Sequence, residues 1–131
     1  MIVLTVDDEP AFTKAINDFI ADIDPHAKVL MANTESEGWR IYSEFGNSID
    51  LILMDGNLGS GITSVPLIER IKKSGFHGRI FGLTGADPRS SPLPGQMLRA
   101  GCLRILQKPV DYKEIEQVLQ ECPSVAIEAT G

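Results

Sequence analysis

Short apolar runs alternate with longer periodic stretches along the chain. Five runs are rich in apolar or β-branched residues and end at polar or turn residues: 2–6, 28–32, 51–54, 79–84 and 103–107. Such runs are typical of strands buried on both faces of a parallel sheet. Between them, apolar residues recur at helical spacing, as at Phe12, Ile16 and Phe19. The repeated strand–helix order predicts an α/β fold with helices on both faces of a five-stranded sheet.

Capping and helix-breaking residues set the expected ends of the helices. Pro10 suits the first turn of the first helix, and Thr34 with Glu37 predicts a capping box for the second. The fourth helix is expected only over residues 97–100, because 86–96 contain three prolines. Asp111 is expected to cap the last helix. Three aromatic residues of the second helix are expected in the core: Trp39, Tyr42 and Phe45.

Polar residues follow the predicted strands, and their positions suggest a shared site. Right-handed crossovers leave few topologies, of which the doubly wound, flavodoxin-like strand order 2-1-3-4-5 is our prediction. All carboxyl ends then lie at one edge of the sheet. The first strand presents Asp7 and Asp8 there, the third Asp55, the fourth Thr84 and the fifth Lys108. The first and third strands are neighbours, so three carboxylates converge. Their mutual repulsion requires cations, which we expect to be Lys108 and a divalent ion. An all-oxygen site favours Mg²⁺ or Mn²⁺.

The expected chemistry of this site is acceptance of a phosphoryl group. A carboxylate is a competent nucleophile and would form an acyl phosphate. A metal ion and an ammonium group would neutralise the charge that develops on the phosphoryl oxygens. Asp55 stands alone between the acidic pair and the Thr84 and Lys108 positions, so it is the candidate acceptor.

Length, charge and cysteine content exclude several other classes. The 131 residues correspond to one domain, which we place at residues 1–122 with a C-terminal tail at 123–131. A net charge of −6 without blocks of like charge disfavours a nucleic-acid-binding surface. No apolar run approaches the ~20 residues of a membrane span, and no signal peptide is recognisable, so we expect a cytoplasmic domain. Cys102 and Cys122 are expected to be reduced, buried thiols, and His26 and His77 to be surface residues.

At these strand ends the chain resembles the receiver domain of two-component response regulators. The resemblance covers about residues 2–119 and rests on an acidic pair, an aspartate, a threonine and a Lys-Pro pair, each after its own strand. It implies that Asp7 and Asp8 hold Mg²⁺, that Asp55 is phosphorylated and also binds the metal, and that Asn57 offers its backbone carbonyl to it. It further implies that Thr84 and Lys108 bind the phosphoryl group.

The resemblance also implies how such a domain acts. Receiver domains accept the phosphoryl group from a phosphohistidine of a histidine kinase or a phosphotransfer protein, and hydrolyse it slowly. They are signalling domains rather than enzymes, and some belong to hybrid histidine kinases. A cis peptide bond between Lys108 and Pro109 is expected from the family, whereas X–Pro bonds in general are cis in only ~5–6% of cases.

Three departures from the family pattern concern switching. Leu58-Gly59 replaces the usual Met-Pro pair after the acceptor, and we expect a looser loop there. Ile105 occupies the position of an aromatic residue, which puts the usual threonine–aromatic coupling in doubt. The interval from Thr84 to Lys108 carries about two extra residues, within the proline-rich segment 87–96. These departures predict an output surface unlike the usual one.

Other functions fit the sequence less well. A nucleotide or flavin binder on the same fold needs a small or hydroxyl-rich loop after the first strand, whereas acids stand there and would repel phosphate. A haloacid-dehalogenase-like phosphatase needs an Asp-x-Asp motif, but here the acids are adjacent. The alternative is a degenerate receiver that serves only as an interaction scaffold. Ile105 favours this alternative, because it stands where the family has an aromatic residue.

Overall fold

Five parallel strands form one sheet in the computed structural model, which describes residues 1–122. The order is β2-β1-β3-β4-β5, which confirms the predicted flavodoxin-like topology. The strands span these residues: β1 Ile2–Val6, β2 Lys28–Ala32, β3 Leu51–Asp55, β4 Arg79–Thr84 and β5 Arg104–Gln107. The tail expected at 123–131 lies outside the described residues.

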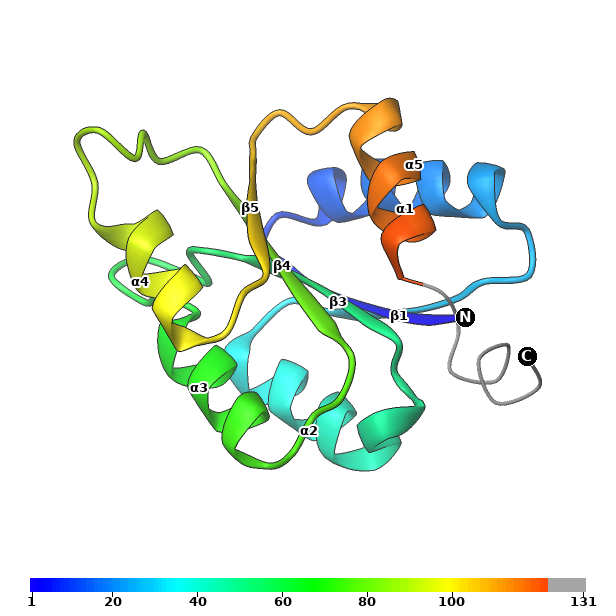
Figure 1. Cartoon of the computed structure of the whole chain (residues 1–131), viewed down its shortest axis with the longest axis horizontal. Helices are drawn as coiled ribbons and strands as arrows, with labels where there is room; N and C mark the ends of the chain where they lie inside the picture. Colours follow the sequence, from blue (N-terminus) through cyan, green and yellow to red (C-terminus); the bar gives the residue numbers. More distant parts are fainter. Residues whose placement is uncertain (123–131) are drawn as a thin grey trace.

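Helices cover both faces of the sheet (Figure 1). On one face lie α1 (Pro10–Ile23) and α5 (Tyr112–Glu121), whose apolar residues pack in one core cluster. On the other face lie α2 (Glu35–Phe45), α3 (Val65–Lys73) and α4 (Leu93–Ala100), which contribute to a second cluster. A short 3₁₀ helix at Gly46–Ser48 follows α2. All five residues of β3 are buried, because this strand is central in the sheet and covered on both sides.

The fourth helix is longer than the sequence suggested. We expected helix only at residues 97–100, and this boundary was wrong because α4 begins at Leu93. Proline is tolerated in the first turn of a helix, where its missing N–H has no intrahelical partner. Leu93 and Met97 are both buried against the sheet, so tertiary packing supports a helix that the local composition disfavours.

The two predicted caps have different outcomes. Asp111 forms a complete capping box with Glu114 at the start of α5. At the start of α2, Thr34 Oγ1 accepts the backbone N–H of Glu37 at 3.1 Å, as predicted. The Glu37 carboxylate, however, accepts the N–H of Asn33 instead of that of Thr34. The predicted hydrogen bond from the Thr34 N–H to the Glu37 carboxylate is therefore wrong, and the capping box is incomplete.

The aromatic residues of α2 are only partly in the core. Tyr42 is buried, whereas Trp39 and Phe45 are half-buried at its margin. The Arg70 guanidinium lies 3.7 Å from the centre of a Trp39 ring and covers it on the outside. The expectation that all three belong to the core holds fully for Tyr42 alone.

The expectations for the cysteines and histidines agree with the structure. Both cysteines, Cys102 and Cys122, are buried free thiols, and His26 and His77 are exposed. Within residues 1–122, no helix has both the length and the apolar character needed to cross a membrane.

Candidate functional site

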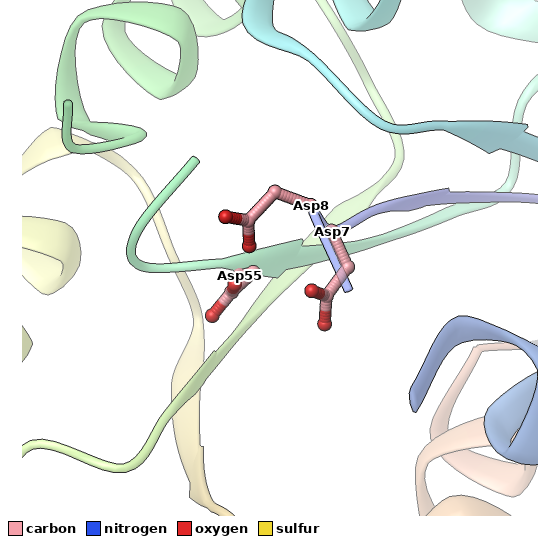
Figure 2. Close-up of side chains that lie close together, drawn as sticks. All are labelled: Asp7, Asp8 and Asp55. Atoms are coloured by element: carbon pink, nitrogen blue, oxygen red, sulfur yellow. The ribbon is translucent and has the colours of Figure 1, made fainter. Parts of the chain in front are cut away.

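The predicted acidic residues converge at the carboxyl edge of the sheet (Figure 2). One carboxylate oxygen from each of Asp7, Asp8 and Asp55 lies within 4.8 Å of the others. Asp7 and Asp55 are almost fully buried, whereas Asp8 is exposed. The cluster is therefore open to solvent on one side and enclosed by protein on the other.

The pairing of β1 with β3 brings the carboxylates together. Val6 pairs with Met54 in parallel register, so Asp7 and Asp55 are the next residues on adjacent strands. Asp7 is held there by two hydrogen bonds: its backbone N–H donates to Ala32 O at 3.0 Å, and its Oδ1 accepts the N–H of Glu9 at 2.9 Å. The second of these leaves Asp7 Oδ2 free to face the site.

Lys108 reaches the same point from the end of β5. Its Nζ lies 3.1 Å from Asp7 Oδ2 and 3.2 Å from Asp55 Oδ1, and its side chain is only 16% exposed. Its backbone N–H donates to Thr84 O at 2.9 Å, which continues the pairing of β4 with β5 beyond the strand ends. The peptide bond between Lys108 and Pro109 is cis, as expected.

Burial and crowding shift the protonation of these groups. Burial, together with the nearby Asp7 carboxylate, raises the pKa of Asp55 from 3.8 to about 7, although Lys108 acts in the opposite direction. Burial lowers the pKa of Lys108, but attraction to Asp55 and Asp7 outweighs it, so the net pKa is raised. The Asp55 carboxyl group therefore ionises less readily than an ordinary aspartate, and further positive charge nearby would favour its anionic form.

Thr84 is buried at the end of β4, beside the strand that carries Asp55. Leu83 pairs with Asp55, so Thr84 extends one residue beyond it towards the site. Its Oγ1 accepts the N–H of Ala86 at 3.0 Å. Because that bond uses the hydroxyl as an acceptor, the hydroxyl proton is available to a ligand.

The glycine-rich loop after Asp55 has a defined internal structure. Asn57 is exposed and forms an isolated antiparallel bridge with Thr63, and the N–H of Leu58 donates to Ile62 O at 2.9 Å. Gly59 and Gly61 have positive φ values of 140° and 73°, which side chains disfavour. Leu58 is buried and so anchors the segment to the core.

Ile105 packs inward on its sheet face. A Cβ built on Gly82 would lie 2.6 Å from both Ile105 Cδ1 and Met97 Cε, so these side chains occupy the space above the glycine. Met97 also approaches Gly56, the residue after Asp55, because a Cβ there would lie 3.1 Å from Met97 Sδ. One buried methionine therefore connects the end of β3 with Ile105.

Glu9 and Phe12 also lie near the site, although the sequence pattern predicts no functional role for either. Glu9 Oε1 lies 3.9 Å from Lys108 Nζ, and the ring centre of Phe12 lies 4.1 Å from the same nitrogen. Glu9 is the third of three consecutive acids after the first strand, and this run is a sequence signal that could have indicated its place near the site. Phe12 had been assigned to the apolar face of the first helix, and no local pattern marks it as a neighbour of a residue 96 positions later.

The donor set fits a hard divalent cation. The three clustered side chains that could bind a metal all offer carboxylate oxygens, which Mg²⁺, Mn²⁺ and Ca²⁺ prefer to nitrogen or sulfur ligands. The exposed Asp8 leaves room for water ligands, and a cation would relieve the charge that raises the pKa of Asp55.

Comparison with known proteins assigns this architecture to a family. The family model described as response regulator receiver domain matches residues 3–120. No curated protein matches the chain. Receiver domains bind Mg²⁺ at an acidic pocket, and the acidic cluster of this chain occupies the corresponding edge of the sheet.

Solved structures resemble the fold over nearly the whole chain. A receiver domain protein from Clostridium thermocellum is 24% identical, covers 98% of this chain and 97% of its own, and has a TM-score of 0.79. A CheY-like receiver protein from Methanospirillum hungatei is 22% identical, with coverages of 99% and 98% and a TM-score of 0.78.

A third similar structure carries ligands. It is a response regulator protein from Burkholderia pseudomallei, described with a phosphorylated aspartic acid, a calcium ion and citrate. It is 22% identical, covers 98% of this chain and 70% of its own, and has a TM-score of 0.75. At these identities, the three structures show the fold alone.

Proposed function

Because the chain belongs to the response regulator receiver domain family, we propose that it is a signalling switch phosphorylated on Asp55. The observation that best supports this is the position of Lys108 Nζ, 3.2 Å from Asp55 Oδ1 and beside three clustered carboxylates. The domain would catalyse only its own phosphorylation and slow dephosphorylation. We take residues 1–122 as the receiver domain.

The transfer forms one bond and breaks another. An Asp55 carboxylate oxygen attacks the phosphorus of a phosphohistidine, and the phosphorus–nitrogen bond breaks with its electron pair left on the donor imidazole. The product is an acyl phosphate on Asp55. Water later attacks the phosphorus, which releases inorganic phosphate and restores the carboxylate. The attacking form is the ionised one, so any group that lowers the pKa of Asp55 favours the reaction.

Asp7, Asp8, Asp55 and the backbone carbonyl of Asn57 would hold Mg²⁺ or Mn²⁺. When bound, the cation supplies positive charge to the phosphoryl oxygens and to the crowded carboxylates. Lys108 would form an ion pair with the phosphoryl group. The Thr84 hydroxyl would donate its free proton to a phosphoryl oxygen.

The partners follow from this chemistry. The donor would be a histidine kinase or a histidine phosphotransfer protein. The phosphorylated form would then change its affinity for an output protein or domain, through the segment after Thr84. We expect no contact of this domain with nucleic acid or a membrane, and a cytoplasmic location.

A scaffold role independent of phosphorylation is the second candidate. It is favoured by Ile105, which packs inward over Gly82 where the family has a movable aromatic residue. In that case the acidic site would bind a cation without transmitting a signal to partners.

The test is phosphorylation by a small donor. The protein is incubated with acetyl phosphate and Mg²⁺, and its intact mass is measured beside those of Asp55→Asn and Asp18→Asn. Asp18 is an exposed helix residue paired with Lys14, so its variant controls for the loss of one carboxylate elsewhere. We expect one added phosphoryl group in the wild type and in Asp18→Asn, and none without Mg²⁺ or in Asp55→Asn.

A negative result would be resolved by a Mg²⁺ titration. If neither Mg²⁺ nor Mn²⁺ binds, phosphorylation of Asp55 is rejected. If a cation binds but no phosphoryl group is added by acetyl phosphate or by phosphohistidine proteins, the scaffold role is favoured.

A further inference from the structure

An aromatic ring lies against the ammonium group of the site lysine. The centre of the Phe12 ring is 4.1 Å from Lys108 Nζ, well inside the ~6 Å within which a cation is attracted by a ring face. Phe12 lies in the first turn of α1, which begins three residues after Asp7. It is half-buried, and the Lys108 side chain is 16% exposed, so water screens the contact only in part.

The ion pairs of the ammonium within residues 1–122 are with three acids. Asp7 Oδ2 and Asp55 Oδ1 lie at 3.1 and 3.2 Å, and Glu9 Oε1 at 3.9 Å. Asp7 and Asp55 are also groups that would bind the cation, and Asp55 loses its free carboxylate on phosphorylation. Both short ion pairs of Lys108 are therefore altered during the proposed reaction. The ring neither binds a hard cation nor reacts.

We propose that Phe12 is a positioning residue that holds the Lys108 ammonium beside Asp55 while the two carboxylates change partners. This inference rests on the proposed phosphorylation of Asp55. The ring supplies an attraction whose strength does not depend on whether a cation or a phosphoryl group is bound. Without it, the flexible lysine side chain would spend less time at the acceptor, and phosphoryl transfer would slow.

The size of the effect follows from the strength of such contacts. A partly desolvated cation–π contact changes an equilibrium by about two- to thirtyfold. We therefore expect Phe12→Leu to slow phosphorylation of Asp55 by acetyl phosphate within that range. Leucine retains an apolar side chain at this position but has no ring face. Phe12→Tyr retains the ring and should keep a rate within about twofold of the wild type.

The experiment combines kinetics with a direct readout of the lysine. Phosphorylation rates are measured at saturating Mg²⁺ for wild type, Phe12→Leu and Phe12→Tyr, and again with Lys108→Met added to each. Phe12→Met is a second ring-free variant, and thermal unfolding checks that all are folded. NMR reports the ε-methylene protons of Lys108, which the ring face should shift upfield in the wild type and in Phe12→Tyr only.

Each outcome decides the inference. Slowing by Phe12→Leu that disappears in the Lys108→Met background, with loss of the upfield shift, supports it. An unchanged rate in folded Phe12→Leu and Phe12→Met overturns it, as does equal slowing in both backgrounds, which would indicate a purely structural role. If the wild type takes no phosphoryl group under any condition, the proposed function fails, and this inference fails with it.

Discussion

Replacing Asp55 by asparagine removes a negative charge from a buried, crowded site, and we expect the metal-free protein to become more stable. Asp55 is 4% exposed and lies close to Asp7, with Lys108 as the nearest cation. Asparagine has nearly the same shape as a protonated aspartic acid. The variant therefore isolates the cost of ionising this carboxyl group in the folded protein.

The magnitude follows from the pKa of Asp55. The folded protein raises this pKa from 3.8 to about 7, and each pKa unit corresponds to ~1.4 kcal/mol. Below the lower value, both the folded and the unfolded chains carry the proton. Between the two values, only the unfolded chain ionises, so the free energy of unfolding falls as the pH rises. Above the upper value the full penalty, of order 4 kcal/mol, is present.

The assay is urea unfolding of wild type, Asp55→Asn and Asp18→Asn from pH 4 to pH 8 in EDTA. We expect Asp55→Asn to exceed the wild type by about 2–4 kcal/mol at pH 8 and by little at pH 4. Asp18→Asn should stay near the wild type at every pH. Added Mg²⁺ should reduce the difference, because it binds the folded wild type and raises its stability.

Two results would refute this reasoning. The first is an Asp55→Asn variant less stable than the wild type at pH 8 in EDTA. That result would mean that the ion pair with Lys108 outweighs burial and repulsion from Asp7. The second is a stability difference that does not change with pH, which would show that the gain has a cause other than ionisation of Asp55.

Three further predictions concern other parts of the chain. Lys108→Met should slow phosphorylation to a low but measurable rate, and should lower the metal-free free energy of unfolding by about 3 kcal/mol at pH 8, since it leaves two buried carboxylates without their ammonium partner; mass spectrometry checks the first effect and urea unfolding the second. Gly82→Ala should cost about 1–2 kcal/mol, because its Cβ would lie 2.6 Å from Ile105 Cδ1, and Ile105→Val in the same chain should recover part of the loss in thermal unfolding. Asp111→Ala should cost about 1 kcal/mol through loss of the α5 capping box, whereas Asp111→Asn should retain most of the stability.

The strands and the acidic site could be predicted because their signals are local. A buried central strand must be apolar along its whole length, so residues 51–54 mark the centre of the sheet. Parallel strands place their carboxyl ends at one edge, which brings Asp7 and Asp55 together once the order is known. The first residues of α1 and α5 could be predicted equally well, because Pro10 and Asp111 act within a single helical turn.

The sequence by itself therefore determined the positions of the strands and the polar residue at the end of each, because apolar runs, capping and strand direction act over a few residues. The predicted strand order, chosen from the few that right-handed crossovers leave, then brought the acidic cluster and Lys108 to one edge. Only the tertiary structure decided the start of α4 at Leu93, the partial exposure of Trp39 and the contact between Phe12 and Lys108. Each of these depends on side chains that are distant in the chain. Whether an apolar residue packs in the core or against a cation is set by the neighbour that folding brings to it, and no local pattern carries that information.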